Sequence, residues 1–293
     1  MIVDTHVHPV ASDTQKYPID PLGGLQSDWS KGFTNTVDEF LAHMKAAGVD
    51  QTTLVQGSTV HGYDNAYTAH CCAAHPDRFV GVACIDPQMP DAADVLSYWI
   101  EEKGLRGVRV FTTGSTLAES NWLGRTLLDP FWQRARQLKI PVCIQIRYSG
   151  IPLLRTVMER YPEIPMLLDH SAGPNLEDGP PYEAAKDLFA LSSYPNLYLK
   201  VSTINLRAAA KGKSTVNEFF EALVEKFTAR HLLWCSNYPS TRGTGPTGWS
   251  GIRPGPGWRR SARTGTRCPW SHSRAVRRRR RTWPGSQPGP RES

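Results

Sequence analysis

The chain has 293 residues, which is enough for one large domain with a sizeable core. Its net charge of +7 arises after residue 240, where thirteen arginines face one acid, so residues 1–240 hold 21 basic and 26 acidic residues. The six cysteines show no CxxC spacing, which argues against a disulfide framework or a thiolate zinc site. No apolar stretch reaches membrane-spanning length and no signal-peptide pattern is present, so we expect a cytoplasmic protein without a membrane partner.

The first predicted element is a buried strand that ends in two histidines. Residues 2–8 open with an apolar run and read Asp-Thr-His-Val-His from position 4. Side chains alternate between the two faces of a strand, so His6 and His8 lie on the same side, roughly 7 Å apart along the chain. Two adjacent imidazoles can share a metal ion or bind one anionic substrate, and a pair of purely structural histidines is the simpler alternative.

Strand-like apolar runs alternate with amphipathic helical patterns eight times between residues 1 and 240. Strands are predicted at 2–8, 51–56, 79–85, 107–111, 142–147, 166–170, 197–202 and 232–236. Helices are predicted between Thr36 and Gly48, and at 65–75, 92–102, 130–138, 152–161, 182–192 and 216–227. This alternation predicts the α/β class and a (β/α)8 TIM barrel. A doubly wound open sheet is the alternative, but no glycine-rich phosphate loop follows the first strand.

Several short segments, taken in this order and spacing, carry a resemblance to a known family. They read DTHVH at 4–8, AGVD at 47–50, HPDRFVG at 75–81, GLRGVR at 104–109, DH at 169–170, LKVS at 199–202 and LWCSNYP at 233–239. The chain resembles the amidohydrolase-related, metal-dependent hydrolases with a barrel fold. It is most similar to the branch that includes sugar lactonases and the hydrolases of pyrone and muconolactone carboxylates, over essentially all of residues 1–240.

The resemblance implies a hydrolytic site built from the paired histidines, a histidine after the sixth strand and an aspartate after the eighth. In many relatives this site holds one divalent metal, zinc or manganese, and in the lactone-carboxylate branch the metal can be dispensable. The metal ligands implied here are His6, His8 and His170.

Two departures from the family pattern weaken the implied metal site. Asn237 stands where relatives commonly carry an aspartate, and an amide can neither take up a proton nor bring negative charge to a cation. The fifth strand, 142–147, carries neither the histidine nor the modified lysine that metal-binding relatives often supply there. The sequence therefore favours a metal-poor site over a tight one.

In a barrel of this type, chemistry gathers at the C-terminal ends of the strands, and polar residues stand at most of the predicted ends. Arg109 and Arg147 suit an anionic substrate because a guanidinium binds a carboxylate bidentately, and Tyr148 can donate to the same anion. The structural alternatives are salt bridges for the arginines and a strand-capping role for the tyrosine. His170 is predicted as general base or carbonyl polariser, with a structural histidine as the alternative.

The other predicted site residues complete the reaction. His6 and His8 hold the metal or, without one, stabilise the developing oxyanion. Asn237 positions water. Lys200 is either a cation near the leaving oxygen or a lysine paired with an acid at the base of the barrel.

These expectations together predict a hydrolase of a small anionic lactone, working in the breakdown of aromatic compounds. The enzymatic alternative is a metal-dependent decarboxylase of aromatic acids on the same fold. The non-enzymatic alternative is a catalytically impaired barrel that binds a ligand, which the amide at position 237 favours.

The last segment, 241–293, is rich in Arg, Gly, Pro and Trp and contains no Leu, Phe or Tyr. It is interpreted as an out-of-frame translation product, a solvated disordered tail, or an arm that binds nucleic acid, the last being least favoured. If it replaces the final barrel helix, apolar surface beside the first and eighth strands is left uncovered, which predicts self-association.

Overall fold

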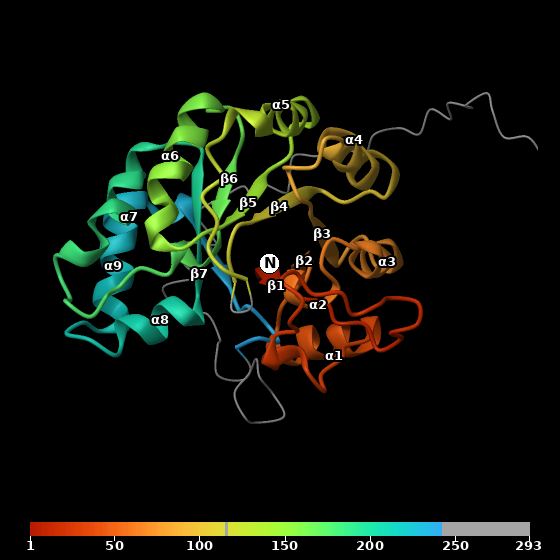
Figure 1. Cartoon of the computed structure of the whole chain (residues 1–293). Coiled ribbons are helices and arrows are strands. Elements are labelled where there is room, and N and C mark those ends of the chain that lie inside the picture. The colour runs from red at the N-terminus through yellow and green to blue at the C-terminus, as the bar shows by residue number, and fades with distance from the viewer. Residues whose placement is uncertain (115–116, 242–293) are drawn as a thin grey trace, which may run out of the picture.

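Eight parallel strands form a single sheet in which each strand pairs with the next along the chain (Figure 1). The computed structural model describes residues 1–114 and 117–241. The strands are β1 (Val3–Val7), β2 (Gln51–Val55), β3 (Phe79–Cys84), β4 (Gly107–Phe111), β5 (Val142–Gln145), β6 (Met166–Leu168), β7 (Leu197–Ser202) and β8 (Leu232–Cys235).

The first and last strands meet, so that the sheet closes almost completely on itself. A parallel bridge joins Val7 to Tyr238, beyond the end of β8. The backbone N–H of His8 donates to the carbonyl of Tyr238 at 2.8 Å, and that of Asn237 donates to the carbonyl of His6 at 2.9 Å. The predicted TIM barrel is confirmed.

Helices lie outside the strands in the order expected for a barrel (Figure 1). They are α1 (Val37–Ala47), α2 (Ser58–His61), α3 (Ala66–Ala74), α4 (Ala92–Ser97), α5 (Asp129–Leu138), α6 (Ile151–Arg160), α7 (Lys186–Ala190), α8 (Thr203–Ala209) and α9 (Val216–Phe227). The predicted capping box is present at α1, where Thr36 and Glu39 satisfy each other's backbone N–H groups. Gly48 ends this helix at φ 69°, a left-handed conformation that favours glycine.

The structure differs from the sequence prediction mainly where strands give way to loops. The fifth and sixth strands end two residues early because the chain turns into short 3-10 segments, Tyr148–Gly150 and Asp169–Ala172. Two short helices, α2 and α8, were not predicted. The helix predicted at 92–102 is α4 followed by a π-helical turn, Tyr98–Glu102, and only part of 182–192 forms α7.

Alternation along each strand divides the buried residues into two sets. On β4, Val108 and Val110 belong to the large apolar cluster that contains residues of the surrounding helices, whereas Arg109 projects to the opposite face. A small apolar cluster collects residues of five strands: Val55, Val82, Cys143, Leu167 and Leu233. The barrel interior is therefore partly apolar and partly charged.

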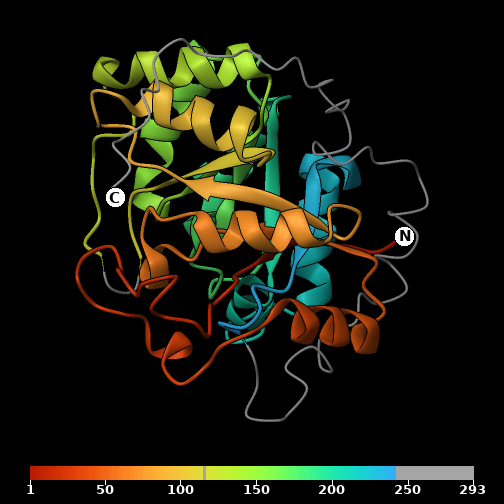
Figure 2. The ribbon, with the colours of Figure 1, turned by 90° about the vertical axis from the view of Figure 1, so that its right-hand side faces the viewer.

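A long connection between β1 and α1 covers the end of the barrel toward which the strands point (Figure 2). His61 on α2 holds this connection in place. Its Nε2 accepts from the N–H of Ala11 at 3.1 Å, and its Nδ1 donates to the carbonyl of Pro18 at 2.8 Å.

In the described residues, no helix is both long and apolar enough to cross a membrane. The predictions made for 242–293 lie outside the described residues.

Candidate active site

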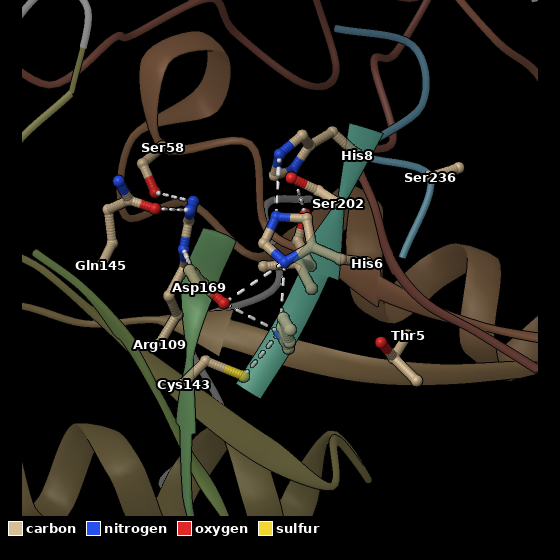
Figure 3. Close-up of polar contacts among 12 residues, drawn as sticks. Thr5, His6, His8, Ser58, Arg109, Cys143, Gln145, Asp169, Ser202 and Ser236 are labelled. Carbon is tan, nitrogen blue, oxygen red and sulfur yellow. Dashed lines mark hydrogen bonds and ion pairs between the residues drawn. The ribbon is translucent and has the colours of Figure 1, made fainter. Parts of the chain in front are cut away.

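His6 in β1 and His8 just after it are buried and turn toward each other (Figure 3). Their Nε2 atoms are 3.2 Å apart. His8 Nδ1 lies 2.9 Å from the carbonyl oxygen of Val55, which can only accept, so His8 carries its proton on Nδ1. The lone pair of His8 Nε2 therefore faces His6, and His6 is the donor in this contact.

Arg109, Asp169 and Lys200, which we call the charged cluster, lie next to His6. Arg109 Nε donates to Asp169 Oδ2 at 2.8 Å, and Lys200 Nζ lies 3.0 Å from Asp169 Oδ1. Lys200 Nζ is also 3.1 Å from His6 Nδ1 and 3.1 Å from Cys143 Sγ. Three strands, β4, β7 and the end of β6, thus bring two cations to one carboxylate.

Mutual attraction keeps this cluster ionised despite its burial. Burial alone would raise the pKa of Asp169, but Lys200, His6 and Arg109 together hold that pKa well below its ordinary value. Burial opposes the charge of Lys200, and Asp169 nevertheless raises the pKa of the ammonium. The charged cluster therefore carries two positive charges and one negative charge.

The three histidines around it are neutral at pH 7. Burial and the charge of Lys200 lower the pKa of His6 well below its ordinary value. Burial and Arg109 lower the pKa of His8 to about 3, and burial is the main cause that lowers the pKa of His170 to about 4. The site therefore presents imidazole rings that can accept or donate a proton, and no imidazolium.

His170 reaches the site through an unusual backbone conformation just after β6. His170, Ser171 and Ala172 have φ values of 52°, 49° and 60°, a left-handed region that costs a non-glycine residue about 1 kcal/mol or more. Asn205, in the first turn of α8, holds the loop by donating to the carbonyl of His170 at 2.7 Å. His170 Nδ1 is buried and has no hydrogen-bond partner in the described structure, so either tautomer is open to this ring.

Asn237 follows β8 and is also left-handed, at φ 57°. Asparagine adopts this region more readily than most residues, so the amide suits the turn. Its side chain lines the cavity, and its Oδ1 is buried without a partner among the described residues.

A cavity of about 370 Å³ opens above these groups. His8, Arg109, His170 and Gln145 belong to its wall, together with two aromatic side chains, Trp29 and Phe111. Trp29 comes from the connection after β1 and stacks on His8, with ring centroids 5.5 Å apart. The wall also contains Arg207 of α8, and no acidic side chain is among the described residues that line it.

The structure does not bring every predicted residue to this cavity. Arg147 is exposed, donates to the hydroxyl of Thr113 at 3.2 Å and is absent from the described cavity wall. The hydroxyl of Tyr148 accepts from the N–H of Asp187, at the start of α7. Lys200 is fully buried behind His6 and, like His6, does not line the cavity.

Sequence reasoning missed Trp29, Ser58 and Arg207. Each lies on a loop or a short helix that was not predicted, so no periodic pattern marked them. Ser58 and Gln145 help to hold Arg109: the guanidinium donates to Gln145 Oε1 at 3.0 Å and to Ser58 Oγ at 3.4 Å (Figure 3).

Comparison with known proteins places the chain in a family. The family model described as amidohydrolase matches residues 3–260. The chain belongs to the amidohydrolase family. The family and a lactonase relative make it an enzyme of the hydrolase type.

That relative is the L-fucono-1,5-lactonase of Burkholderia ambifaria, 25% identical over 252 residues, which are 84% of this chain and 83% of the relative. Two solved structures share the fold at lower identity. One is described as a probable 2-pyrone-4,6-dicarboxylic acid hydrolase of Acinetobacter baumannii with citric acid bound (18% identity, TM-score 0.64, 82% and 85% of the two chains). The other is a dihydroxybenzoic acid decarboxylase of Polaromonas sp. JS666 with manganese and an inhibitor bound (16% identity, TM-score 0.59, 89% and 94%).

The manganese in that relative raises the question of whether this amidohydrolase can hold a metal. Among its described residues, no group of three or more His, Cys, Asp or Glu side chains is arranged to hold an ion. His6 presents a proton rather than a lone pair to His8, and the Lys200 ammonium lies 3.1 Å from the ring. With the proton of His6 on Nε2 and the ammonium beside its ring, this donor set does not fit a divalent metal. The metal site of His6, His8 and His170 that the resemblance implies is not tested by the structure and stays a prediction.

Proposed function

We propose that this amidohydrolase hydrolyses a small lactone that carries a carboxylate or a similar anionic group. The observation that carries the proposal is the charge of the cavity wall. Arg109 is paired with Asp169, whereas Arg207 makes no hydrogen bond or ion pair within the described residues. An unpaired guanidinium in a wall without acidic side chains suits an anion, and the lactonase relative supports a cyclic ester as the reacting group.

In this proposal Arg207 binds the anionic group and the aromatic walls contact the ring of the substrate. Trp29 and Phe111 are the aromatic side chains of the described wall that are available for that contact. The substrate then lies over Arg109, whose guanidinium is fixed by Asp169, Gln145 and Ser58. A positive charge held in place before the reaction stabilises the oxyanion that forms when water attacks the lactone carbonyl.

His170 is the proposed proton-transfer group. Its pKa of about 4 keeps the ring unprotonated at pH 7, and the negative charge of a bound substrate raises the proton affinity of the ring. The imidazole of His170 takes a proton from the attacking water. It returns this proton to the ring oxygen of the lactone as the carbon–oxygen bond of the lactone breaks. Asn237 holds the water through its unpartnered Oδ1 but cannot take up the proton.

A panel of paired substrates tests the proposal. Full-length protein is assayed by acid release with lactones that differ only in a carboxylate, which is present in one member of each pair and esterified in the other. We expect turnover of the carboxylated member and at least about a tenfold higher kcat/KM for it, since one charge-assisted bond is lost in the ester. Turnover that ignores the carboxylate, or no turnover of any lactone, contradicts the proposal.

Decarboxylation of an aromatic acid is the second candidate. The cationic wall and the two aromatic side chains suit a hydroxybenzoate as well as a lactone, and the decarboxylase relative has the same fold. Release of CO2 from dihydroxybenzoates, in parallel assays with and without added manganese, distinguishes this reaction from acid release by lactones. Three expectations from the sequence remain predictions: a role in the breakdown of aromatic compounds, a cytoplasmic location and self-association.

A further inference from the structure

Lys200 is a buried charged side chain that the proposed reaction does not use. Its side chain is fully buried on β7, and no part of it lines the cavity. Its Nζ instead contacts His6 Nδ1, Asp169 Oδ1 and Cys143 Sγ. We propose that the Lys200 ammonium takes the place of a bound cation in this barrel, and that it keeps divalent metal ions away from His6 and His8.

The first argument is the direction of the hydrogen bonds. An ammonium can only donate, so His6 Nδ1 at 3.1 Å accepts and the ring proton of His6 is on Nε2. That proton points to His8 Nε2 at 3.2 Å, and His8 Nδ1 donates to the carbonyl of Val55 at 2.9 Å. A metal ion between the two rings needs a lone pair on both Nε2 atoms, and Lys200 removes the one on His6.

The second argument is charge. The charged cluster already holds one more positive than negative charge in a fully buried position. A divalent ion at His6 and His8 would add two more positive charges beside Lys200 and Arg109. Like charges in a buried site of low dielectric repel strongly, and the described cavity wall offers no carboxylate to offset them.

The same geometry shows what removal of the ammonium does. His6 Nδ1 lies 3.4 Å from Asp169 Oδ1, the same oxygen that pairs with the Lys200 ammonium at 3.0 Å. Without Lys200, His6 can carry its proton on Nδ1 and donate it to this oxygen, the arrangement of carboxylate and histidine common at metal centres. Both Nε2 lone pairs then face one point, and their separation suits two ligands at about 2.1 Å from one ion.

The test compares metal binding by the full-length protein and by Lys200→Met, which keeps the length of the side chain without its charge. Co2+ binding is followed by its visible spectrum, and Zn2+ binding by competition with a chromogenic chelator. We expect Lys200→Met to bind both ions at least about 100-fold more tightly than the wild type, because one full charge near the ion is removed. The gain should disappear in the double variant Lys200→Met, His6→Gln.

Two matched controls separate this role from general effects of substitution. Lys200→Arg keeps the charge and should bind metal as weakly as the wild type. Lys211→Met removes an exposed charge beyond the end of α8 and should change nothing. Equal affinities of the wild type and Lys200→Met, or tight binding by the wild type that is lost in His6→Gln, would overturn the inference.

A second measurement needs no variant at position 200. The 15N chemical shifts of the imidazole of His6 in the wild-type protein, assigned by comparison with His6→Gln, distinguish the two tautomers directly. We expect the proton on Nε2, and a proton on Nδ1 would overturn the inference. Neither readout depends on lactone hydrolysis, so this inference and the proposed function can fail separately.

Discussion

Two parts of the barrel interior are equally buried and are built in opposite ways. The apolar part, represented by Leu167 of β6, packs by shape and needs no particular partner. Asp169, two residues later in the chain, belongs to the charged cluster, in which the charge of each member is stabilised by the others. Buried ion pairs are on the whole no better for stability than apolar residues of similar size, so this contrast indicates that the charged cluster is there for function.

Four of the seven described non-glycine residues with positive φ lie at the charged end of the barrel, and the other three, Lys139, Tyr182 and Thr228, lie at helix ends elsewhere. The left-handed residues His170, Ser171, Ala172 and Asn237 all follow β6 or β8 at the charged end of the barrel. Strain of this kind persists where the surrounding structure holds it, and it is typical of functional sites. The apolar strands below contain none of the non-glycine residues with positive φ.

A substitution in the charged cluster should cause the greatest loss of stability. Asp169→Asn leaves Lys200 and Arg109 buried without a counter-charge, so the free energy of unfolding should fall by about 3–5 kcal/mol. Urea denaturation followed by circular dichroism measures the loss. A loss below about 1 kcal/mol would show that the cluster is not held by mutual attraction.

A substitution in the apolar part should lower the stability of the protein without lowering its catalytic activity. Leu167→Ala removes buried methyl groups and leaves a cavity, which should lower the free energy of unfolding by about 2–4 kcal/mol. The kcat/KM of the remaining folded protein should stay within about threefold of the wild type, because Leu167 does not line the cavity. A large loss of kcat/KM would mean that the two parts are not independent.

Acid should lower the free energy of unfolding, because the buried histidines beside the charged cluster are neutral in the folded protein. His6, His8 and His170 have pKa values below the ordinary 6.5, so unfolding takes up protons as the pH falls below 6.5. Asp4, whose pKa burial raises to about 6, acts in the opposite direction between pH 6 and 3.8. On unfolding, these four groups together take up about two protons, which lowers the free energy of unfolding by about 3 kcal/mol per pH unit between about pH 6 and 4.5.

Urea midpoints at pH 7, 6 and 5 measure this slope, with His170→Gln as the matched variant that should reduce it by about one proton. A slope that does not change in His170→Gln would show that this ring is not held neutral by burial.

The sequence predicted the barrel and the histidine pair because both follow from periodicity. Buried parallel strands are continuous apolar runs in the sequence. Two residues that are two positions apart on a strand have their side chains on the same face. The contacts that give the site its charge could not be predicted in this way. Lys200 meets His6 across 194 residues, and Arg109 meets Asp169 across 60.

The choice between the two arginines shows the same limit. Both Arg109 and Arg147 were predicted for the substrate, yet Arg109 lines the cavity as the partner of Asp169 and Arg147 is exposed outside the described cavity wall. Arg207 could not be found, because it lies on α8, a short helix without a clear amphipathic pattern. Side chains on loops and short helices are placed by tertiary packing, which local sequence does not reveal.

A comparison of Arg207→Gln with Arg147→Gln on a carboxylated lactone tests directly whether this cavity binds an anionic substrate. Both variants remove one exposed guanidinium, but only Arg207 belongs to the described cavity wall. We predict that Arg207→Gln raises KM by about 10–100-fold with little change in kcat, as expected when a bond to a non-reacting part of the substrate is lost, and that Arg147→Gln changes neither. Equal effects of the two substitutions, or none from Arg207→Gln, would contradict an anionic substrate bound in this cavity.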